Sequence, residues 1–139
     1  MSPADALRET AYEVLESGLF VFLTEGAAGP PDGPSFTMDI RGGPPAEVGM
    51  SASYGAARLL ASQMLGCELS DVTDADRDLA TSEALNIVAG ALVARTLGSG
   101  PELELCPPVA GGAPRGTALA FDTESGPICL WFALLPGAA

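Results

Sequence analysis

Residues 73–98 read TDADRDLATSEALNIVAGALVARTLG, a pattern that predicts one long helix. Thr73, or Asp71 two residues before it, can cap the start with a side-chain oxygen, and Gly98 follows the end near Leu97. On a helical wheel at about 100° per residue, one broad arc is apolar and should be buried. That arc holds Ala84, Leu85, Val88, Ala91 and Leu92.

The opposite side of this helix carries a polar pair among small residues. Glu83 and Asn86 lie one turn apart there, Gly90 follows Asn86 by four positions, and Leu79 and Ala94 extend the strip. Asparagine costs a helix interior about 0.5–0.7 kcal/mol relative to alanine, and glycine costs about 1 kcal/mol. Because Asn86 and Gly90 lower the stability of the helix, we expect this face to contact another surface. Gly90 is then the position where that surface comes closest.

The rest of the chain predicts three strands before and three strands after a pair of helices. Phe36, Met38 and Ile40 alternate with polar side chains, which is typical of a half-buried strand. In chain order we expect a helix over 3–17, strands over 19–23, 35–41 and 48–52, a helix between Ser53 and Gly66, the long helix, and strands over 103–105, 117–122 and 128–135. The expected fold is α+β, a two-layer α/β sandwich in the order α-β-β-β-α-α-β-β-β with a mostly antiparallel sheet, forming a single domain over residues 1–139.

The composition excludes several kinds of catalytic site. The 139 residues contain no histidine, and all six basic residues are arginines. Nucleophiles that depend on histidine, Schiff-base lysines and P-loop lysines are therefore impossible. The three cysteines are widely spaced and form no C-x-x-C pair, so neither a zinc site nor a disulfide framework is indicated. We expect no cofactor and no bound metal of the protein's own.

The charge and hydropathy of the chain favour a protein partner. The net charge is −12, and basic clusters are missing, so binding to nucleic acid or to an anionic membrane surface is disfavoured. No apolar run reaches the roughly 18 residues that cross a bilayer, and the first residues lack the pattern of a signal peptide. We expect a cytoplasmic protein whose partner presents a lysine or a bound cation.

Taken alone, the E-x-x-N spacing of Glu83 and Asn86 has an ordinary alternative. Such pairs are frequent by chance, and Glu83 could be a solvated charge with Asn86 incidental. Three segments together change this interpretation: Ser82–Gly90 resembles the E-x-x-N-x-x-x-G signature of the CheC/CheX/FliY family of CheY-phosphate phosphatases. Leu59–Gly66 resembles that family's helix ending in M-L-G, and Cys106–Gly111 resembles its P-P-x-v-x-G segment.

The resemblance implies a protein that dephosphorylates a CheY-like response regulator in chemotaxis or two-component signalling. Asn86 would orient the attacking water, and Glu83 would pair with the active-site lysine of the receiver domain. The receiver would supply that lysine and the Mg²⁺ ion, which suits a chain without histidine, lysine or metal ligands. Family members often carry Asp or Ser four residues before the glutamate, whereas this chain has Leu79 there and Asp78 one residue earlier.

Two alternatives stay open beside the phosphatase. Leu79 favours a non-catalytic module that binds a receiver without turnover, and a homodimeric scaffold of the same fold needs no receiver at all. The resemblance also implies a homodimer, built through exchange of the C-terminal β region. The apolar strand Ile128–Leu135 motivates that expectation, because such a strand left open at the edge of a sheet invites pairing.

Overall fold

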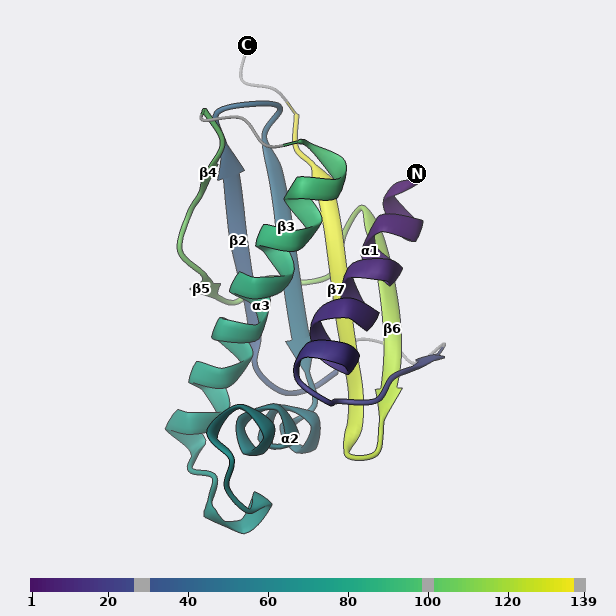
Figure 1. Ribbon diagram of the computed structural model, residues 1–139. Coiled ribbons are helices and arrows are strands. Elements are labelled where there is room, and N and C mark those ends of the chain that lie inside the picture. Colours follow the sequence, from purple (N-terminus) through teal and green to yellow (C-terminus); the bar gives the residue numbers. More distant parts are fainter. Residues whose placement is uncertain (27–30, 99–101, 137–139) are drawn as a thin grey trace.

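The computed structural model describes residues 1–26, 31–98 and 102–136. In this part of the chain a layer of helices lies on one face of an antiparallel sheet, which confirms the α+β sandwich (Figure 1). The elements are α1 (Pro3–Ala11), its π-helical continuation η1 (Tyr12–Gly18), β1 (Thr24–Gly26), β2 (Ser35–Arg41), β3 (Ala46–Ala52), α2 (Tyr54–Leu65), the 3₁₀ turn η2 (Leu69–Asp71), α3 (Asp74–Thr96), β4 (Glu104–Leu105), β5 (Val109–Ala110), β6 (Thr117–Thr123) and β7 (Gly126–Leu134).

The order of the strands places β7 inside the sheet. The sequence of neighbours is β1-β6-β7-β3-β2-β4, with β5 pairing a second part of β2, and every pairing is antiparallel. Leu130 of β7 lies opposite Met50 of β3 on one side and Leu119 of β6 on the other. The expectation of an open edge at Ile128–Leu135 is therefore wrong, because both sides of this strand already have partners. The homodimer stays a prediction without that argument.

The core lies between the helices and one face of the sheet. Helix α3 packs over β2 and β3, α1 packs over β6 and β7, and α2 packs against α3 and one end of the sheet (Figure 1). The alternation predicted for β2 is confirmed, since Met38 and Ile40 are buried on this face. Other large side chains that are fully buried are Leu7, Leu15, Met50, Leu60, Leu85, Leu92, Phe121, Ile128 and Leu130.

Serine side chains cap the starts of the first two helices, and a glycine ends the second. The Oγ of Ser2 accepts a hydrogen bond from the Asp5 amide at 3.1 Å, and the Oγ of Ser53 accepts one from the Ala56 amide at 3.1 Å. Gly66 ends α2 in the left-handed conformation at φ +67°, which glycine adopts without the strain of a side chain. These contacts satisfy backbone groups that a helix end leaves unpaired.

Residues 19–23 do not form the predicted strand. Their backbone amides bond back to the preceding helix: Leu19 to the Val14 carbonyl at 3.0 Å, and Val21 to the Leu15 carbonyl at 2.8 Å. Phe20 takes a positive φ of +59°, and both Phe20 and Phe22 are exposed, so the apolar run covers no continuous buried face. The strand β1 starts only at Thr24, since the amides of Leu19, Phe20 and Val21 bond to helix carbonyls and that of Leu23 bonds to the Glu16 carboxylate.

The other face of the sheet contains a buried carboxylate with its partners. Trp131 of β7 is fully buried over Gly49, and its Nε1 donates a hydrogen bond to the Glu47 carboxylate at 3.0 Å. Arg115, in the segment between β5 and β6, donates to the same carboxylate from Nε at 2.9 Å and from Nη2 at 2.7 Å. The hydrogen bonds from Arg115, helped by Trp131, hold the pKa of Glu47 below its ordinary value despite burial. This cluster fastens the segment before β6 to the sheet.

Candidate functional site on helix α3

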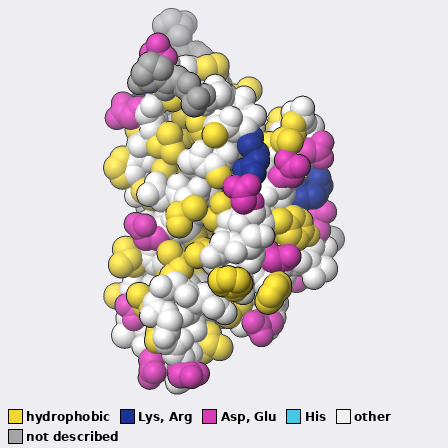
Figure 2. All heavy atoms as spheres, in the orientation of Figure 1, with side chains coloured by type: hydrophobic (Ala, Val, Ile, Leu, Met, Phe, Trp, Pro, Cys, Tyr) yellow, Lys and Arg dark blue, Asp and Glu magenta, His cyan; other side chains and the backbone are white. Residues whose placement is uncertain are grey.

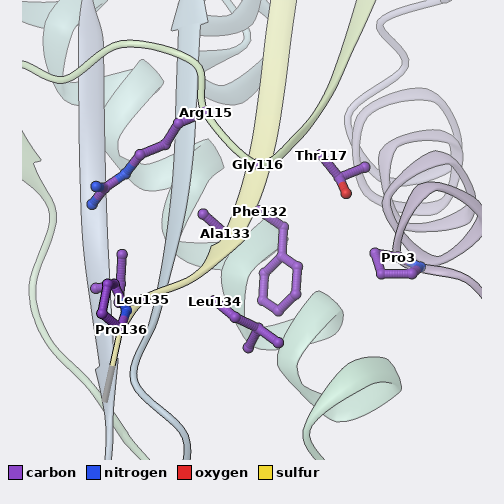
Figure 3. Close-up of a pocket in the computed structure, with 9 residues that line it drawn as sticks. All are labelled: Pro3, Arg115, Gly116, Thr117, Phe132, Ala133, Leu134, Leu135 and Pro136. Atoms are coloured by element: carbon purple, nitrogen blue, oxygen red, sulfur yellow. The ribbon is translucent and has the colours of Figure 1, made fainter. Parts of the chain in front are cut away.

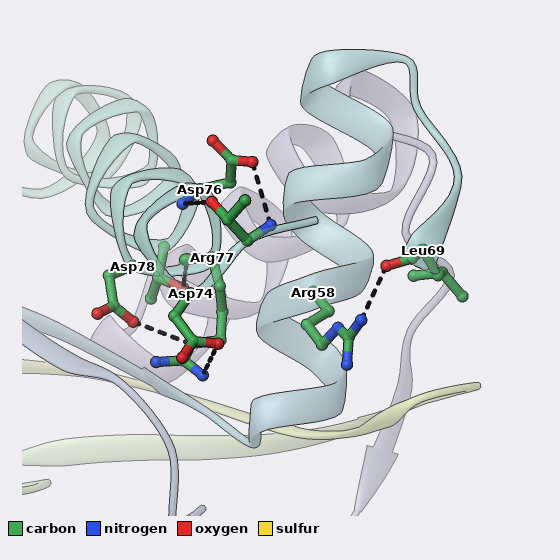
Figure 4. Close-up of polar contacts among 8 residues, drawn as sticks. Arg58, Leu69, Asp74, Asp76, Arg77 and Asp78 are labelled. Carbon is green, nitrogen blue, oxygen red and sulfur yellow. Dashed lines mark hydrogen bonds and ion pairs between the residues drawn. The ribbon is translucent and has the colours of Figure 1, made fainter. Parts of the chain in front are cut away.

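The start of α3 is fixed by a network of polar contacts (Figure 4). Thr73 and Asp76 form a capping box: the Thr73 Oγ1 accepts from the Asp76 amide at 3.0 Å, and the Asp76 Oδ2 accepts from the Thr73 amide at 3.1 Å. The Arg77 guanidinium pairs with Asp74 at 3.2 Å and with Asp78 at 3.0 Å. It also lies 4.8 Å from the centre of the ring of Tyr54, the first residue of α2, which ties α3 to α2.

The far end of α3 is held against α1. Arg95 donates a hydrogen bond from Nη1 to the Thr10 hydroxyl at 3.0 Å and pairs with the Glu13 carboxylate. Between the two ends, α3 buries the apolar arc predicted from the sequence, with Ala84, Leu85, Val88 and Leu92 fully covered. Because both ends and the buried face are anchored, the direction of the outward face is set by the fold.

The outward face carries the predicted pair, as a set of residues that we call the α3 strip: Leu79, Glu83, Asn86, Ile87 and Gly90. All five are exposed, with Leu79 at 64% and Ile87 at 46%. Within the described residues, the side chains of Glu83 and Asn86 have no hydrogen bond or ion pair, and an added Cβ at Gly90 would meet nothing within 4 Å. The packing of the chain itself therefore gives no reason for a glycine at position 90.

A small hollow lies beside Glu83, between the last turn of α2 and the first turns of α3. Its volume is about 180 Å³, and its lining is Met64, Leu65, Asp76, Leu79, Ala80 and Glu83. Leu65 is 58% exposed, and Leu79 on α3 is exposed as well. The sequence shows the M-L-G ending of the Leu59–Gly66 segment. No spacing along the chain indicates that Met64 and Leu65 line a hollow together with Glu83.

Asp78 does not take the place of the missing acidic residue at position 79. Its carboxylate accepts a hydrogen bond from the Arg77 Nε at 3.0 Å. On the helical wheel it lies well over 100° away from the centre of the α3 strip, because one residue corresponds to about 100°. It lines another hollow, of about 210 Å³, together with Arg77, Tyr54 and Phe36. Position 79, one helical turn before Glu83, therefore presents an apolar leucine instead of an acidic side chain.

A separate hollow of about 340 Å³ lies at the end of the sheet near Pro3 (Figure 3). Phe132, Leu134 and Pro136 give it an apolar lining, and Arg115 is the only charged residue among the described residues that line it. Since the Arg115 guanidinium is bonded to Glu47, this hollow brings together no acid and base. It carries none of the residues predicted for the site.

The surface around the helices is rich in carboxylates (Figure 2). Acidic side chains appear at more places on this face than basic ones, in keeping with the net charge of −12. In the part of the chain that the structure describes, no three histidine, cysteine, aspartate or glutamate side chains gather as metal ligands. The helices of the same part include none that is long and apolar enough to cross a bilayer.

No protein-family model matches the sequence, and no curated protein sequence matches it either. Solved structures do match over nearly the whole chain. The chemotaxis protein CheX from Desulfovibrio desulfuricans has a TM-score of 0.74 and 18% identity, over 97% of this chain and 100% of that one. CheX from Vibrio vulnificus has a TM-score of 0.72 and 18% identity, over 96% and 97%.

A third matching structure is that of a complex. CheX in the CheX–CheY–BeF₃–Mg²⁺ complex from Borrelia burgdorferi has a TM-score of 0.68 and 19% identity, over 94% of this chain and 97% of that one. The agreement in length and topology, at low identity, concerns the fold. The chain therefore has the CheX-like fold, with the α3 strip on its outward helix face.

Proposed function

We propose that this protein binds a CheY-like receiver domain and hydrolyses its aspartyl phosphate, using Glu83 and Asn86. The observation that carries the proposal is the exposure of this pair, without partners of its own, on an anchored helix of a CheX-like fold. A carboxylate and an amide held outward on a rigid helix can enter the active site of another protein. The Borrelia burgdorferi relative, whose structure contains CheY, supports the choice of partner.

The chemical roles of this protein and of the receiver follow from the side chains that each can supply. Hydrolysis of a phosphoryl group requires a water in line with the leaving oxygen and neutralisation of the charge that develops. Mg²⁺ and the lysine of the receiver supply that neutralisation, because this chain has no lysine or histidine. The Asn86 amide both donates and accepts hydrogen bonds, so it can orient the water. The Glu83 carboxylate accepts from the lysine and holds α3 in register.

Gly90 fits the same proposal as a point of close approach. A glycine in an exposed helix position costs about 1 kcal/mol relative to alanine, and none of the described residues fills the space above Gly90. Gly90 lies one turn beyond Asn86 on the α3 strip, where the receiver would come nearest to the helix backbone. The absence of a side chain there lets the Asn86 amide reach further into the partner.

A non-catalytic receiver-binding module is the second candidate, and Leu79 favours it. An apolar residue one turn before Glu83 adds contact area without adding a group that can take part in proton transfer or charge neutralisation. Such a module would bind the receiver through the same strip and leave the phosphoryl half-life unchanged. Binding and turnover must therefore be measured separately.

The decay of a phosphorylated CheY receiver, followed with and without the protein, tests the proposal. Asn86→Ala should lower the hydrolysis rate at saturating protein by about 10²–10³-fold, because it removes a polar contact made mainly in the transition state. Binding to the receiver should change much less. Ala75→Ser, at another exposed position of α3, is the matched control and should leave the rate unchanged.

Equal half-lives with the wild-type protein and with Asn86→Ala would rule out the catalytic role of Asn86. If the half-life with either protein also equals that without protein, and both proteins bind the receiver, the non-catalytic module becomes the correct description. If neither protein binds any receiver, the homodimeric scaffold is what is left, and light scattering then reports the oligomeric state.

A further inference from the structure

The hollow between α2 and α3 is lined by both aliphatic and acidic residues. Met64, Leu65, Leu79 and Ala80 provide aliphatic walls, and the carboxylates of Asp76 and Glu83 complete the lining. Leu65 and Leu79, one from each helix, are both more than half exposed. A side chain that can contact both the aliphatic and the acidic residues of the lining has a long apolar stem and a cationic head.

We propose that this hollow is a docking subsite for a long basic side chain, an arginine or lysine, on the surface of the receiver. This inference rests on the proposed function for the identity of the partner. The stem of the basic residue lies against Leu65 and Leu79, and its head reaches the Asp76 carboxylate. The residue is distinct from the active-site lysine, because its acceptor, Asp76, lies seven residues, or about 10 Å along the helix, from Glu83, which binds that lysine.

Charge complementarity supports a basic occupant. The first three turns of α3 hold four carboxylates, Asp74, Asp76, Asp78 and Glu83, and one guanidinium, that of Arg77. Arg77 pairs with Asp74 and Asp78, and none of the described residues forms an ion pair with Asp76 or Glu83. The partial positive charge of a helix start is only about half a unit, so these carboxylates outweigh it.

The geometry of Asp76 also leaves it available. Its Oδ2 accepts the hydrogen bond from the Thr73 amide, which fixes the direction of the carboxylate. A carboxylate offers about four lone-pair sites on two oxygens, so one oxygen can still accept from a cation. The capping box thus positions this acceptor, whose residue lines the hollow, before a partner arrives. The subsite would select among receivers by the residue that each presents there.

A pair of opposite charges at Leu65 tests the inference. Leu65 lines the hollow but lies outside the α3 strip, and its exposure means that neither Leu65→Lys nor Leu65→Glu buries a charge in the core. The affinity of each variant is measured for a CheY receiver loaded with Mg²⁺ and BeF₃⁻, a mimic of the phosphoryl group. Leu69→Lys and Leu69→Glu are the matched controls, since Leu69 is exposed in η2 and lines a different hollow.

We expect Leu65→Lys to weaken binding about tenfold and Leu65→Glu to bind as tightly as wild type or more tightly. The Leu69 pair, which makes the same changes in net charge, should show a difference of less than threefold. At saturating protein, both Leu69 variants should hydrolyse the phosphoryl group at the wild-type rate, because Leu69 lines a hollow that contains neither Glu83 nor Asn86.

Other outcomes overturn the inference in recognisable ways. Equal weakening by Leu65→Lys and Leu65→Glu would mean an apolar occupant, and no change with either would mean that the hollow is empty in the complex. If the two Leu65 variants change the receiver affinity in opposite directions but the wild-type protein does not hydrolyse the phosphoryl group, the docking subsite is supported and the catalytic part of the proposed function is wrong. If the wild-type protein binds no receiver, the proposed function and the subsite fail together.

Discussion

Glu47 is the second residue of β3 and Glu83 lies near the middle of α3, and the two glutamates differ in burial and in hydrogen-bond partners. Glu47 on β3 is only 9% exposed, and its two carboxylate oxygens receive three hydrogen bonds, from Arg115 and Trp131. Glu83 on α3 is exposed, and no described side chain pairs with it. One carboxylate is satisfied inside the fold, and the other is open to a partner.

The difference shows how the role of a charge can be judged from its partners. A carboxylate taken out of water without hydrogen bonds costs several kcal/mol, so Glu47 has to be paired for the sheet to form. An exposed carboxylate costs the fold almost nothing, and its hydrogen-bonding capacity stays free. The net charge of −12 counts both groups equally and does not separate these roles.

Removing Glu47 should have the largest effect on stability. Glu47→Ala leaves the buried Nε1 of Trp131 without an acceptor, and an unsatisfied buried donor costs about 1–3 kcal/mol. Urea denaturation at neutral pH should show a loss of this size in the free energy of unfolding. The receiver affinity of the folded variant should stay at the wild-type value, and a large loss of affinity would contradict the separation between the two glutamates.

Removing Glu83 should produce the opposite result. Glu83→Ala should change the free energy of unfolding by less than about 0.5 kcal/mol, as for an ordinary surface substitution. Its affinity for the receiver should fall about tenfold, which corresponds to about 1.4 kcal/mol, because a charge-assisted contact with lysine is lost. The two numbers come from denaturation and from titration with the Mg²⁺–BeF₃⁻ form of the receiver. A destabilised Glu83→Ala would show that this residue has a partner within the fold.

Gly90→Ala should raise the free energy of unfolding by about 1 kcal/mol while weakening receiver binding. The stabilisation follows from helix propensity and from the open space around position 90. Ala94→Gly, at an exposed position one turn later, calibrates the helix effect with the opposite sign. A variant that is more stable and binds equally well would remove Gly90 from the proposed contact.

The smallest expected effect is the pH dependence of the stability that Glu47 contributes. Because the pKa of Glu47 is lowered in the folded protein, its contribution is present above its unfolded pKa of about 4.3 and is lost as the pH falls through its folded pKa. The difference in unfolding free energy between wild type and Glu47→Gln should therefore shrink on acidification from pH 6. A difference that stays constant down to pH 3 would mean that the Glu47 carboxylate has the same pKa in both states.

Local pattern was sufficient for the helices and for most of the strands. Thr73 caps α3 and α2 lies between Ser53 and Gly66 as predicted, and the alternation of β2 gives its buried face correctly. Such features depend on residues within about four positions of one another, so they can be read from the chain directly. The exposure of Glu83, Asn86 and Gly90 on one face followed from the helical period in the same way.

The apolar runs at 19–23 and 128–135 look alike in the sequence but have different structures. The first bonds back to its own helix and exposes Phe20 and Phe22, whereas the second becomes the strand β7 with neighbours on both sides. Hydrophobicity shows that a segment prefers to be covered, but it does not show which backbone groups are still free to pair. That depends on segments more than seventy residues away, such as β3 for β7.

The residues alone were enough to identify the long helix, its buried arc and the polar pair on its outer face, because helix period and capping are local properties. The hollow at Leu65 and Leu79 and the cluster around Glu47 came only from the tertiary structure. Both bring together side chains from separate elements, and their contact depends on how helices and strands pack rather than on any spacing along the chain. The same packing decides which of two glutamates is buried with partners and which stays exposed.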